Sequence, residues 1–329
     1  DRRSFLATAG AALAAPSLAR AQARTTVTIQ IDGAAVPFYA PLYVAAQNDM
    51  FARRGLDVRF VYANAADILR NVAAGNVEFG FPNGDSVIAA RANDIPIKVI
   101  HTTYQRGIGA TLFKRSSGIR SFADLRGKRV AVTALGSPNY LQLQVGLRQA
   151  GLTVNDVRVE VIATGAIVQA LQADQVDAIV FSELRRYNLE ADGVEVGMIS
   201  SNDFLPSFGN VVVASERFAR ERGAQARGMI DGLDEALQWI IAGNVDAALR
   251  IAIDNHAQTW RGQEALLGRV FRESFIASIW QSEHTRANGL GFGHLPSWQR
   301  NIDILAEYRV IDRRFPAEQL VVQPRSIGA

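Results

Sequence analysis

Residues 77–104, "VEFGFPNGDSVIAARANDIPIKVIHTTY", decide the fold class. An apolar, β-rich run at 77–81 is followed by a helical pattern at 85–94 and by a second β-rich run at 96–104. Strand, helix and strand in direct succession is the pattern of a parallel β-sheet whose strands are connected by helices. This stretch therefore predicts an α/β fold.

The same alternation extends along the rest of the chain. Before residue 77, the sequence predicts strands at 26–31 and 56–62 and helices at 41–54 and 66–75. After residue 120 the pattern restarts, with strands and helices predicted within 121–137, 158–162, 165–174, 176–182 and 194–200. A strand at 210–215 follows, and most of the remaining chain is predicted to be helical.

Two segments are placed to carry the chain into and out of its middle part, "GATLFKRSSG" (109–118) and "FGNVVVASE" (208–216). They predict two lobes: a discontinuous first lobe of 24–112 plus 211–329, and an inserted second lobe of 113–210. Ligand pockets favour interfaces between lobes, beyond the carboxyl ends of parallel strands. We therefore expect the functional site between the lobes.

The composition is that of a packed globular protein, with 48% hydrophobic and 20% charged residues among 329. The chain has no cysteine, which excludes disulfides, thiolate metal sites and cysteine catalysis. Its formal net charge is only +3, and three of its arginines lie in the first 23 residues. No cluster of Lys and Arg is interleaved with aromatic residues, so no nucleic-acid partner is expected.

Residues 1–23, "DRRSFLATAGAALAAPSLARAQA", have the layout of an export signal. Twin arginines at Arg2 and Arg3 precede an Ala-rich apolar stretch, and Ala21 and Ala23 form a small-x-small cleavage site. The "RRSFL" segment resembles the twin-arginine type of signal. The apolar stretch is too short to span a membrane and is interrupted by Pro16. These features predict a cleavable signal peptide and a periplasmic protein.

The loop "ALGSPNY" (134–140) joins a predicted strand to a predicted helix, a position where phosphates and nucleophilic serines are held in other proteins. A Walker loop requires Gly-Lys-Ser/Thr, and a nucleophile elbow requires glycines two positions before and after the serine, where this chain has Leu135 and Asn139. Both catalytic interpretations therefore fail. Ser137 is instead the expected N-cap and Pro138 the first helical residue. The free N–H groups of a helix start predict ligand contact here, with Gly136, Ser137, Asn139 and Tyr140 as candidates.

Polar and aromatic residues follow other strands at the same predicted sheet edge. These further candidates for ligand contact are Asp32, Phe38, Tyr39, Asn83, Asp85, Ser86, Tyr104 and Glu183. Aromatic rings stack on a planar ligand, and the three carboxylates accept N–H protons from a ring or an amino group. The set favours a neutral or amino-bearing heteroaromatic ligand over a small anion. We expect no catalytic residue, no cofactor and no metal, because no nucleophile–base pair is found and the spacing of His284 and His294 fits no metal site.

Four segments, in this order, resemble one protein family: "YAPLYVAAQNDMFARRGLDVRF", "VAAGNVEFGF…VIAARANDIPIKVI", "SFADLRGKRVAV" and "IVQALQADQVDAIVF". They are similar to the solute-binding proteins of ABC importers. The subgroup is the NMT1/THI5-like one, which binds thiamine pyrimidine precursors and riboflavin and is akin to alkanesulfonate- and taurine-binding proteins. The resemblance implies a type II periplasmic-binding-protein fold, with two α/β lobes, a two-stranded hinge and a cleft that closes on a ligand.

The resemblance also implies which loops contact the solute. They are the loop after the first strand, the loop at 83–86 and the helix start at 136–140, with Glu183 at the acidic position of pyrimidine-binding members. The first loop, "DGAAVPFY" (32–39), lacks the tryptophan that pyrimidine-binding relatives often carry. Eukaryotic relatives that synthesise the pyrimidine depend on a cysteine-rich motif, which a chain without cysteine does not have.

The sequence thus leads to the hypothesis of an exported, monomeric, non-catalytic receptor. It would close on a small aromatic N-heterocycle and deliver it to the membrane subunits of an ABC permease. The alternative is a receptor for an organic anion, such as an alkanesulfonate, taurine or an aromatic carboxylate. Ser137 and the N–H groups of Asn139 and Tyr140 would then hold the acid group. An exported enzyme and a sensor-type binding module are the remaining alternatives.

Overall fold

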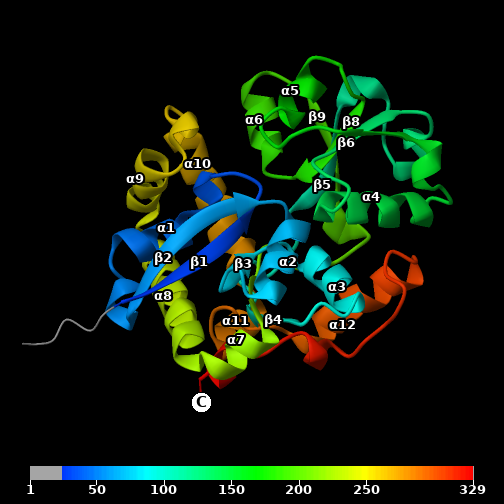
Figure 1. Cartoon of the computed structure of the whole chain (residues 1–329). Helices are drawn as coiled ribbons and strands as arrows, with labels where there is room; N and C mark the ends of the chain where they lie inside the picture. Colours follow the sequence, from blue (N-terminus) through cyan, green and yellow to red (C-terminus); the bar gives the residue numbers. More distant parts are fainter. Residues whose placement is uncertain (1–23, 329) are drawn as a thin grey trace, which may run out of the picture.

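Residues 24–328 fold into two α/β lobes, each built on one five-stranded sheet (Figure 1). The computed structural model describes residues 24–328, so the predicted export signal at 1–23 lies outside the described residues. Between residues 24 and 328, none of the helices combines the length and the apolar character needed to cross a membrane.

The sheet of the first lobe has the strand order β2-β1-β3-β10-β4. Strand β1 pairs in parallel with β2 and β3, whereas β10 runs antiparallel to its neighbours β3 and β4. The strands are β1 (Thr25–Asp32), β2 (Leu56–Ala63), β3 (Phe79–Phe81), β4 (Ile97–His101) and β10 (Val212–Ser215). The stretch 77–104 forms β3, helix α3 (Gly84–Ala92) and β4, in the order that its pattern predicts.

The second lobe repeats this layout in the order β7-β6-β8-β5-β9. Strand β6 is parallel to β7 and β8, and β5 is antiparallel to β8 and β9. The strands are β5 (Gly109–Lys114), β6 (Arg129–Val132), β7 (Arg158–Val161), β8 (Ala178–Ser182) and β9 (Val196–Ser200). The sequence predicts parallel sheets, but each sheet is mixed, because it contains both parallel and antiparallel pairs of strands. The antiparallel strand in each lobe is the one that the chain forms on entering from the other lobe.

The chain crosses between the lobes twice, at 102–108 and at 201–211. The crossing segments lie side by side, because Tyr104 N donates to Asn210 O at 2.9 Å and Gly107 N donates to Ser207 O at 2.8 Å. Strand β5 pairs along its length within the second sheet, so the first crossing ends a few residues before the predicted boundary at 112. Two paired backbone segments thus connect the lobes.

Helices lie against both sheets (Figure 1). In the first lobe they are α1 (Ala40–Gln47), α2 (Ala65–Ala74), α3, α7 (Glu216–Glu221), α8 (Gly223–Ile241), α9 (Val245–Asn255), α10 (Glu264–Val270), α11 (Glu283–Asn288), α12 (Leu295–Glu307) and a π-helix (Phe271–Ile279). In the second lobe they are α4 (Pro138–Gln149), α5 (Ile167–Gln172) and α6 (Arg185–Ala191).

Alternating side chains divide the core of each lobe between the two faces of its sheet. In the first lobe, Val212 and Ala214 belong to one buried cluster and Val213 to another. In the second lobe, Val130 and Ala131 divide in the same way. Successive residues of a strand point to opposite faces, so burial on both faces fixes the register of each strand. The strand ends, and the loops that follow them, are thereby held in place where the lobes meet.

Candidate functional site

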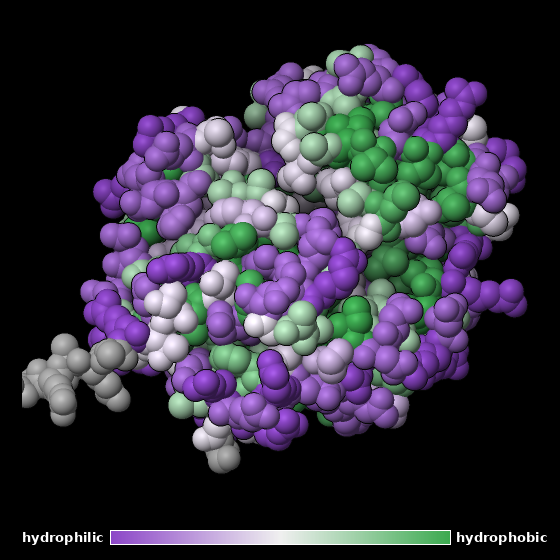
Figure 2. Space-filling view, in the orientation of Figure 1, coloured by the Kyte–Doolittle hydropathy of each residue, from purple (hydrophilic) through white to green (hydrophobic). Residues whose placement is uncertain are grey.

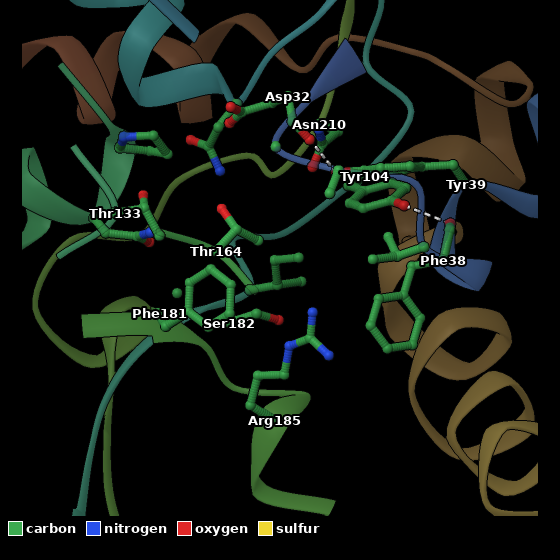
Figure 3. Close-up of a pocket in the computed structure, with 18 of the residues that line it drawn as sticks. Asp32, Phe38, Tyr39, Tyr104, Thr133, Thr164, Phe181, Ser182, Arg185 and Asn210 are labelled. Atoms are coloured by element: carbon green, nitrogen blue, oxygen red, sulfur yellow. Dashed lines mark hydrogen bonds between the residues drawn. The ribbon is translucent and has the colours of Figure 1, made fainter. Parts of the chain in front are cut away.

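A pocket lies between the two lobes and is lined by residues from both (Figure 3). Its cavity volume is about 110 Å³, well above the roughly 10–15 Å³ that one water molecule requires. The molecular surface is hollowed between the lobes, and apolar side chains gather on the visible face of the second lobe (Figure 2). The pocket occupies the interlobe position that the sequence predicts.

Strand topology explains why polar side chains meet in this pocket. Asp32 is the last residue of β1, Ser182 is the last residue of β8, and Thr133 directly follows β6. The carboxyl ends of parallel strands lie at one edge of a sheet. Both lobes contribute such residues to the pocket, so these edges of the two sheets face each other across it.

Six of the residues predicted from the sequence line the pocket: Asp32, Phe38, Tyr39, Asn83, Tyr104 and Asn139. Two of them use their hydroxyl groups to hold the loop that joins β1 to α1. Tyr39 Oη donates to Asp32 O at 2.6 Å, and Tyr104 Oη donates to Phe38 O at 2.8 Å. These two tyrosines therefore fix the shape of the pocket wall with their hydroxyl groups.

Phe38 is the centre of an aromatic cluster behind this wall. Its ring is stacked on that of Phe275, with centroids 5.5 Å apart and planes at 25°, and it meets Trp260 edge-on at 5.5 Å. Phe275 belongs to the π-helix, a rare conformation that occurs often at functional sites. The cluster presents a rigid, mainly apolar surface, which suits a planar ligand.

Asp32 supplies the carboxylate of the pocket. Burial between the lobes raises the pKa of this carboxyl from 3.8 to about 7, although hydrogen bonds from the backbone of Ala65 and Gly33 lower it. Near neutral pH the group is thus divided between its ionised and protonated forms. An N–H donor of a ligand would stabilise the ionised form by replacing the hydrogen bonds that water no longer supplies.

Asp85 and Ser86, both predicted to contact the ligand, are buried in the protein and do not line the pocket. Asp85 Oδ2 accepts a hydrogen bond from Gln142 Nε2 of α4 at 2.9 Å, and burial raises the pKa of this carboxyl to about 6. Asn83 is the N-cap of α3, with its side chain accepting from the backbone N–H of Asp85. Asp85 therefore connects α3 to α4 and does not face the cavity.

Glu183, the third predicted carboxylate, also lies outside the pocket. Its Oε1 is 2.6 Å from Arg106 Nη2, so it forms an ion pair with the crossing segment at 102–108. The predicted cluster of three carboxylates is therefore corrected to one, Asp32. The other two have partners elsewhere in the protein.

The helix start at 136–140 contributes less to the pocket than predicted. Ser137 is the N-cap of α4, as expected, and its hydroxyl donates to Ala134 O at 2.7 Å. Gly136 lies across from Ala66 of the first lobe, and Tyr140 packs against the core of the second lobe. Of this loop, Pro138 and Asn139 line the pocket, whereas Gly136, Ser137 and Tyr140 do not.

Several pocket residues were missed by reasoning from the sequence: Thr133, Gln142, Thr164, Phe181, Ser182, Arg185 and Asn210. Thr133 directly follows β6 and Phe181 and Ser182 end β8, so the strand-end rule that selected Asp32 would also have selected them. Arg185 begins α6 and has no such sequence signal.

The lobes are in contact on both flanks of the pocket. On one flank, the hydrogen bond from Gln142 to Asp85 joins α4 to α3. On the other, Asn188 Nδ2 of α6 donates to Gln263 Oε1, next to α10, at 2.8 Å (Figure 1). The pocket is thus flanked on two sides by contacts between the lobes.

The pocket lining within residues 24–328 includes no histidine, lysine or cysteine, and its carboxylate is Asp32. In the same described range, no group of three or more His, Cys, Asp or Glu side chains is arranged to hold a metal ion. His284 and His294 stack on each other, with ring centroids 3.6 Å apart, outside this pocket.

Two lobes of the same strand order, two paired crossing segments and a pocket between them are the architecture of the periplasmic-binding-protein fold. Solved structures have the same fold. The alkanesulfonate-binding protein SsuA from Xanthomonas axonopodis pv. citri, bound to MOPS, superposes with a TM-score of 0.66 at 20% identity, covering 92% of this chain and 99% of that one. The periplasmic aliphatic sulphonate-binding protein SsuA from Escherichia coli gives a TM-score of 0.61 at 19% identity, covering 91% and 92%.

Residues 36–247 match the family described as NMT1/THI5 like, and the chain belongs to this family. Among its relatives are the riboflavin-binding protein RibY of Chloroflexus aurantiacus, 27% identical over 81% of this chain and 76% of the relative, and the formylaminopyrimidine-binding protein of Halalkalibacterium halodurans, 23% identical over 90% and 89%. The 4-amino-5-hydroxymethyl-2-methylpyrimidine phosphate synthase of Aspergillus parasiticus is 27% identical over only 44% of this chain and 43% of the enzyme. The two binding proteins are thus similar to this chain over most of their length, whereas the synthase is similar over less than half.

Proposed function

We propose that this protein is the periplasmic receptor of an ABC importer and that it captures one small aromatic N-heterocycle between its lobes. The observation that carries the proposal is the interlobe pocket, in which Asp32 is the carboxylate and Phe38 belongs to a wall of aromatic residues. An amino or ring N–H group of the ligand donates to Asp32, and the ring packs on the aromatic wall. The similarity to a riboflavin-binding protein and to a formylaminopyrimidine-binding protein supports this ligand class.

Binding and lobe closure are coupled in this proposal. A ligand between the lobes contacts both of them only when they are closed, so it binds the closed state more tightly and increases its population. The two paired crossing segments act as the hinge. The membrane subunits of the permease then distinguish the closed, loaded receptor from the open one. The receptor itself acts as a monomer after export.

We also propose that the protein does not convert its ligand chemically. The described pocket residues include no histidine, lysine or cysteine, and the pyrimidine-synthesising relatives match less than half of this chain. The chain also has no cysteine for the cysteine-rich motif that those enzymes require. The ligand therefore leaves the pocket unchanged.

Calorimetric titration of the purified protein with an aminopyrimidine, a flavin and an alkanesulfonate tests this function. We expect saturable binding of one heterocycle per chain, with no product detectable by mass spectrometry after long incubation. The variant Asp32→Asn should weaken this binding, whereas Glu183→Gln, which alters a carboxylate outside the pocket, should not. Binding of the alkanesulfonate alone, or conversion of a heterocycle, would refute the proposal.

A further inference from the structure

Arg185 lines the pocket with a positive charge, and a neutral heterocycle offers no anionic group to pair with it. Arg185 reaches into the pocket from the start of α6, on the side opposite Asp32 (Figure 3). Its Nε is buried without a hydrogen-bond partner. Throughout residues 24–328, no carboxylate forms an ion pair with Arg185, in contrast to its neighbour Arg186, which has Glu190 at 3.5 Å. Burial lowers the pKa of Arg185 to about 10, so the guanidinium remains charged at neutral pH.

Three aromatic rings surround this guanidinium. Its Cζ lies 4.8 Å from the ring centroid of Trp260, 5.4 Å from that of Phe181 and 5.9 Å from that of Phe38. The rings attract the positive charge through their faces and fix the side chain in the pocket. They do not accept the N–H groups at the edge of the guanidinium, which are strong donors in a planar fork.

Arg185 is half-buried, and a cation that loses part of its hydration without gaining an anionic partner is costly. The other charged side chain of the pocket, Asp32, lies on the opposite side and forms no ion pair with Arg185. The geometry leaves a gap between the two charged groups, with a donor at one end and an acceptor at the other. A ligand placed in this gap meets both.

We propose that Arg185 is an oxyanion subsite and that the ligand is an acidic N-heteroaromatic. Its carboxylate, sulfonate or phosphate group pairs with the guanidinium, while an N–H group at the far end of the ring donates to Asp32. The inference rests on the proposed function and narrows its ligand class. It also unites the two ligand classes that the sequence left as alternatives, because one molecule carries both the ring and the acid group.

A purely structural role for Arg185 predicts a different result. Arg185 belongs to the second lobe, whereas Phe38 and Trp260 belong to the first, so the guanidinium also joins the closed lobes. If this were its only role, its removal would weaken every ligand by the same factor. An oxyanion subsite instead distinguishes acidic ligands from neutral ones.

Matched ligand pairs separate the two roles. We suggest calorimetric titration of the wild type and Arg185→Gln with 6-aminopyridine-3-carboxylate and 6-aminopyridine-3-carboxamide, whose amino group supplies the N–H donor for Asp32, and with 4-amino-5-hydroxymethyl-2-methylpyrimidine and its phosphate ester. 6-Aminopyridine-3-sulfonate completes the set and identifies the preferred acid group. The control is Arg186→Gln, which removes the adjacent arginine outside the pocket, and thermal unfolding verifies that both variants fold.

In the wild type, we expect the acid of at least one pair to bind more tightly than its neutral partner. Arg185→Gln should weaken that acid roughly 10- to 100-fold more than it weakens the neutral partner. Arg186→Gln should preserve the wild-type preference. An equal loss for both members of each pair, or a wild-type preference for the neutral members, overturns the subsite but leaves the proposed function standing. If no heterocycle of either kind binds the wild type, both the subsite and the proposed function are refuted.

Discussion

The replacement Asp32→Asn should remove a pH-dependent loss of stability that arises in the pocket. Burial raises the pKa of Asp32 from 3.8 to about 7, so the folded protein holds this proton more tightly than the unfolded chain does. The stabilisation from the protonated group is complete below about pH 4 and is lost as the pH rises through 7. At about 1.4 kcal/mol per pKa unit, the shift corresponds to about 4 kcal/mol, of which about 2.5 kcal/mol is lost between pH 5 and 8.

Urea unfolding, followed by tryptophan fluorescence at several pH values across this window, measures the effect; the predicted magnitude applies to the arrangement in which the two lobes are in contact. The free energy of unfolding of Asp32→Asn, minus that of the wild type, should become more positive by about 2.5 kcal/mol from pH 5 to pH 8. The substitution Asp57→Asn is the matched control, because it removes an exposed carboxylate on the adjacent strand β2, outside the pocket. Parallel profiles for Asp32→Asn and the wild type would refute the reasoning, because Asp32 would then be hydrated in the folded protein.

Three further substitutions test the packing around the pocket by urea unfolding. Phe38→Ala removes the ring stacked on Phe275 and should lower the free energy of unfolding by about 3–5 kcal/mol; a loss below about 1 kcal/mol would contradict its place in the aromatic core. Gln142→Leu removes the donor to the buried Asp85 carboxylate and should cost about 1–3 kcal/mol, so a neutral effect would argue against this contact between α3 and α4. Gly109→Ala places a methyl group against the Gln142 amide. The double variant Gly109→Ala with Gln142→Ala should therefore lose less free energy of unfolding than the sum of the losses in the two single variants. Strictly additive losses would contradict the close approach of Gly109 and Gln142.

Local patterns in the sequence were sufficient for the α/β class and for the succession of strands and helices. Hydrophobic periodicity reports which side chains are buried, and caps such as Ser137 before Pro138 report where helices begin. The antiparallel direction of β5 and β10 was not predicted. It depends on how the chain enters each sheet after crossing between the lobes, which no local pattern encodes.

The pocket residues were predicted only in part, because local patterns do not show which distant residues meet in the folded chain. Asp32 and Asn83 were found because residues after parallel strands meet at one sheet edge, and both line the pocket. Asp85 and Glu183 satisfy the same rule but have protein partners 57 and 77 positions away, Gln142 and Arg106, which only the folded chain reveals. Arg185 could not be selected, because its lack of a partner is a property of the assembled pocket.

Native mass spectrometry of the freshly purified protein tests the central claim most directly, that the lobes enclose one aromatic N-heterocycle. We predict one such molecule per monomer, released unchanged on denaturation, with its occupancy reduced in Asp32→Asn and retained in Glu183→Gln. An aliphatic sulfonate in its place, or the chemical conversion of an added heterocycle, would contradict the account.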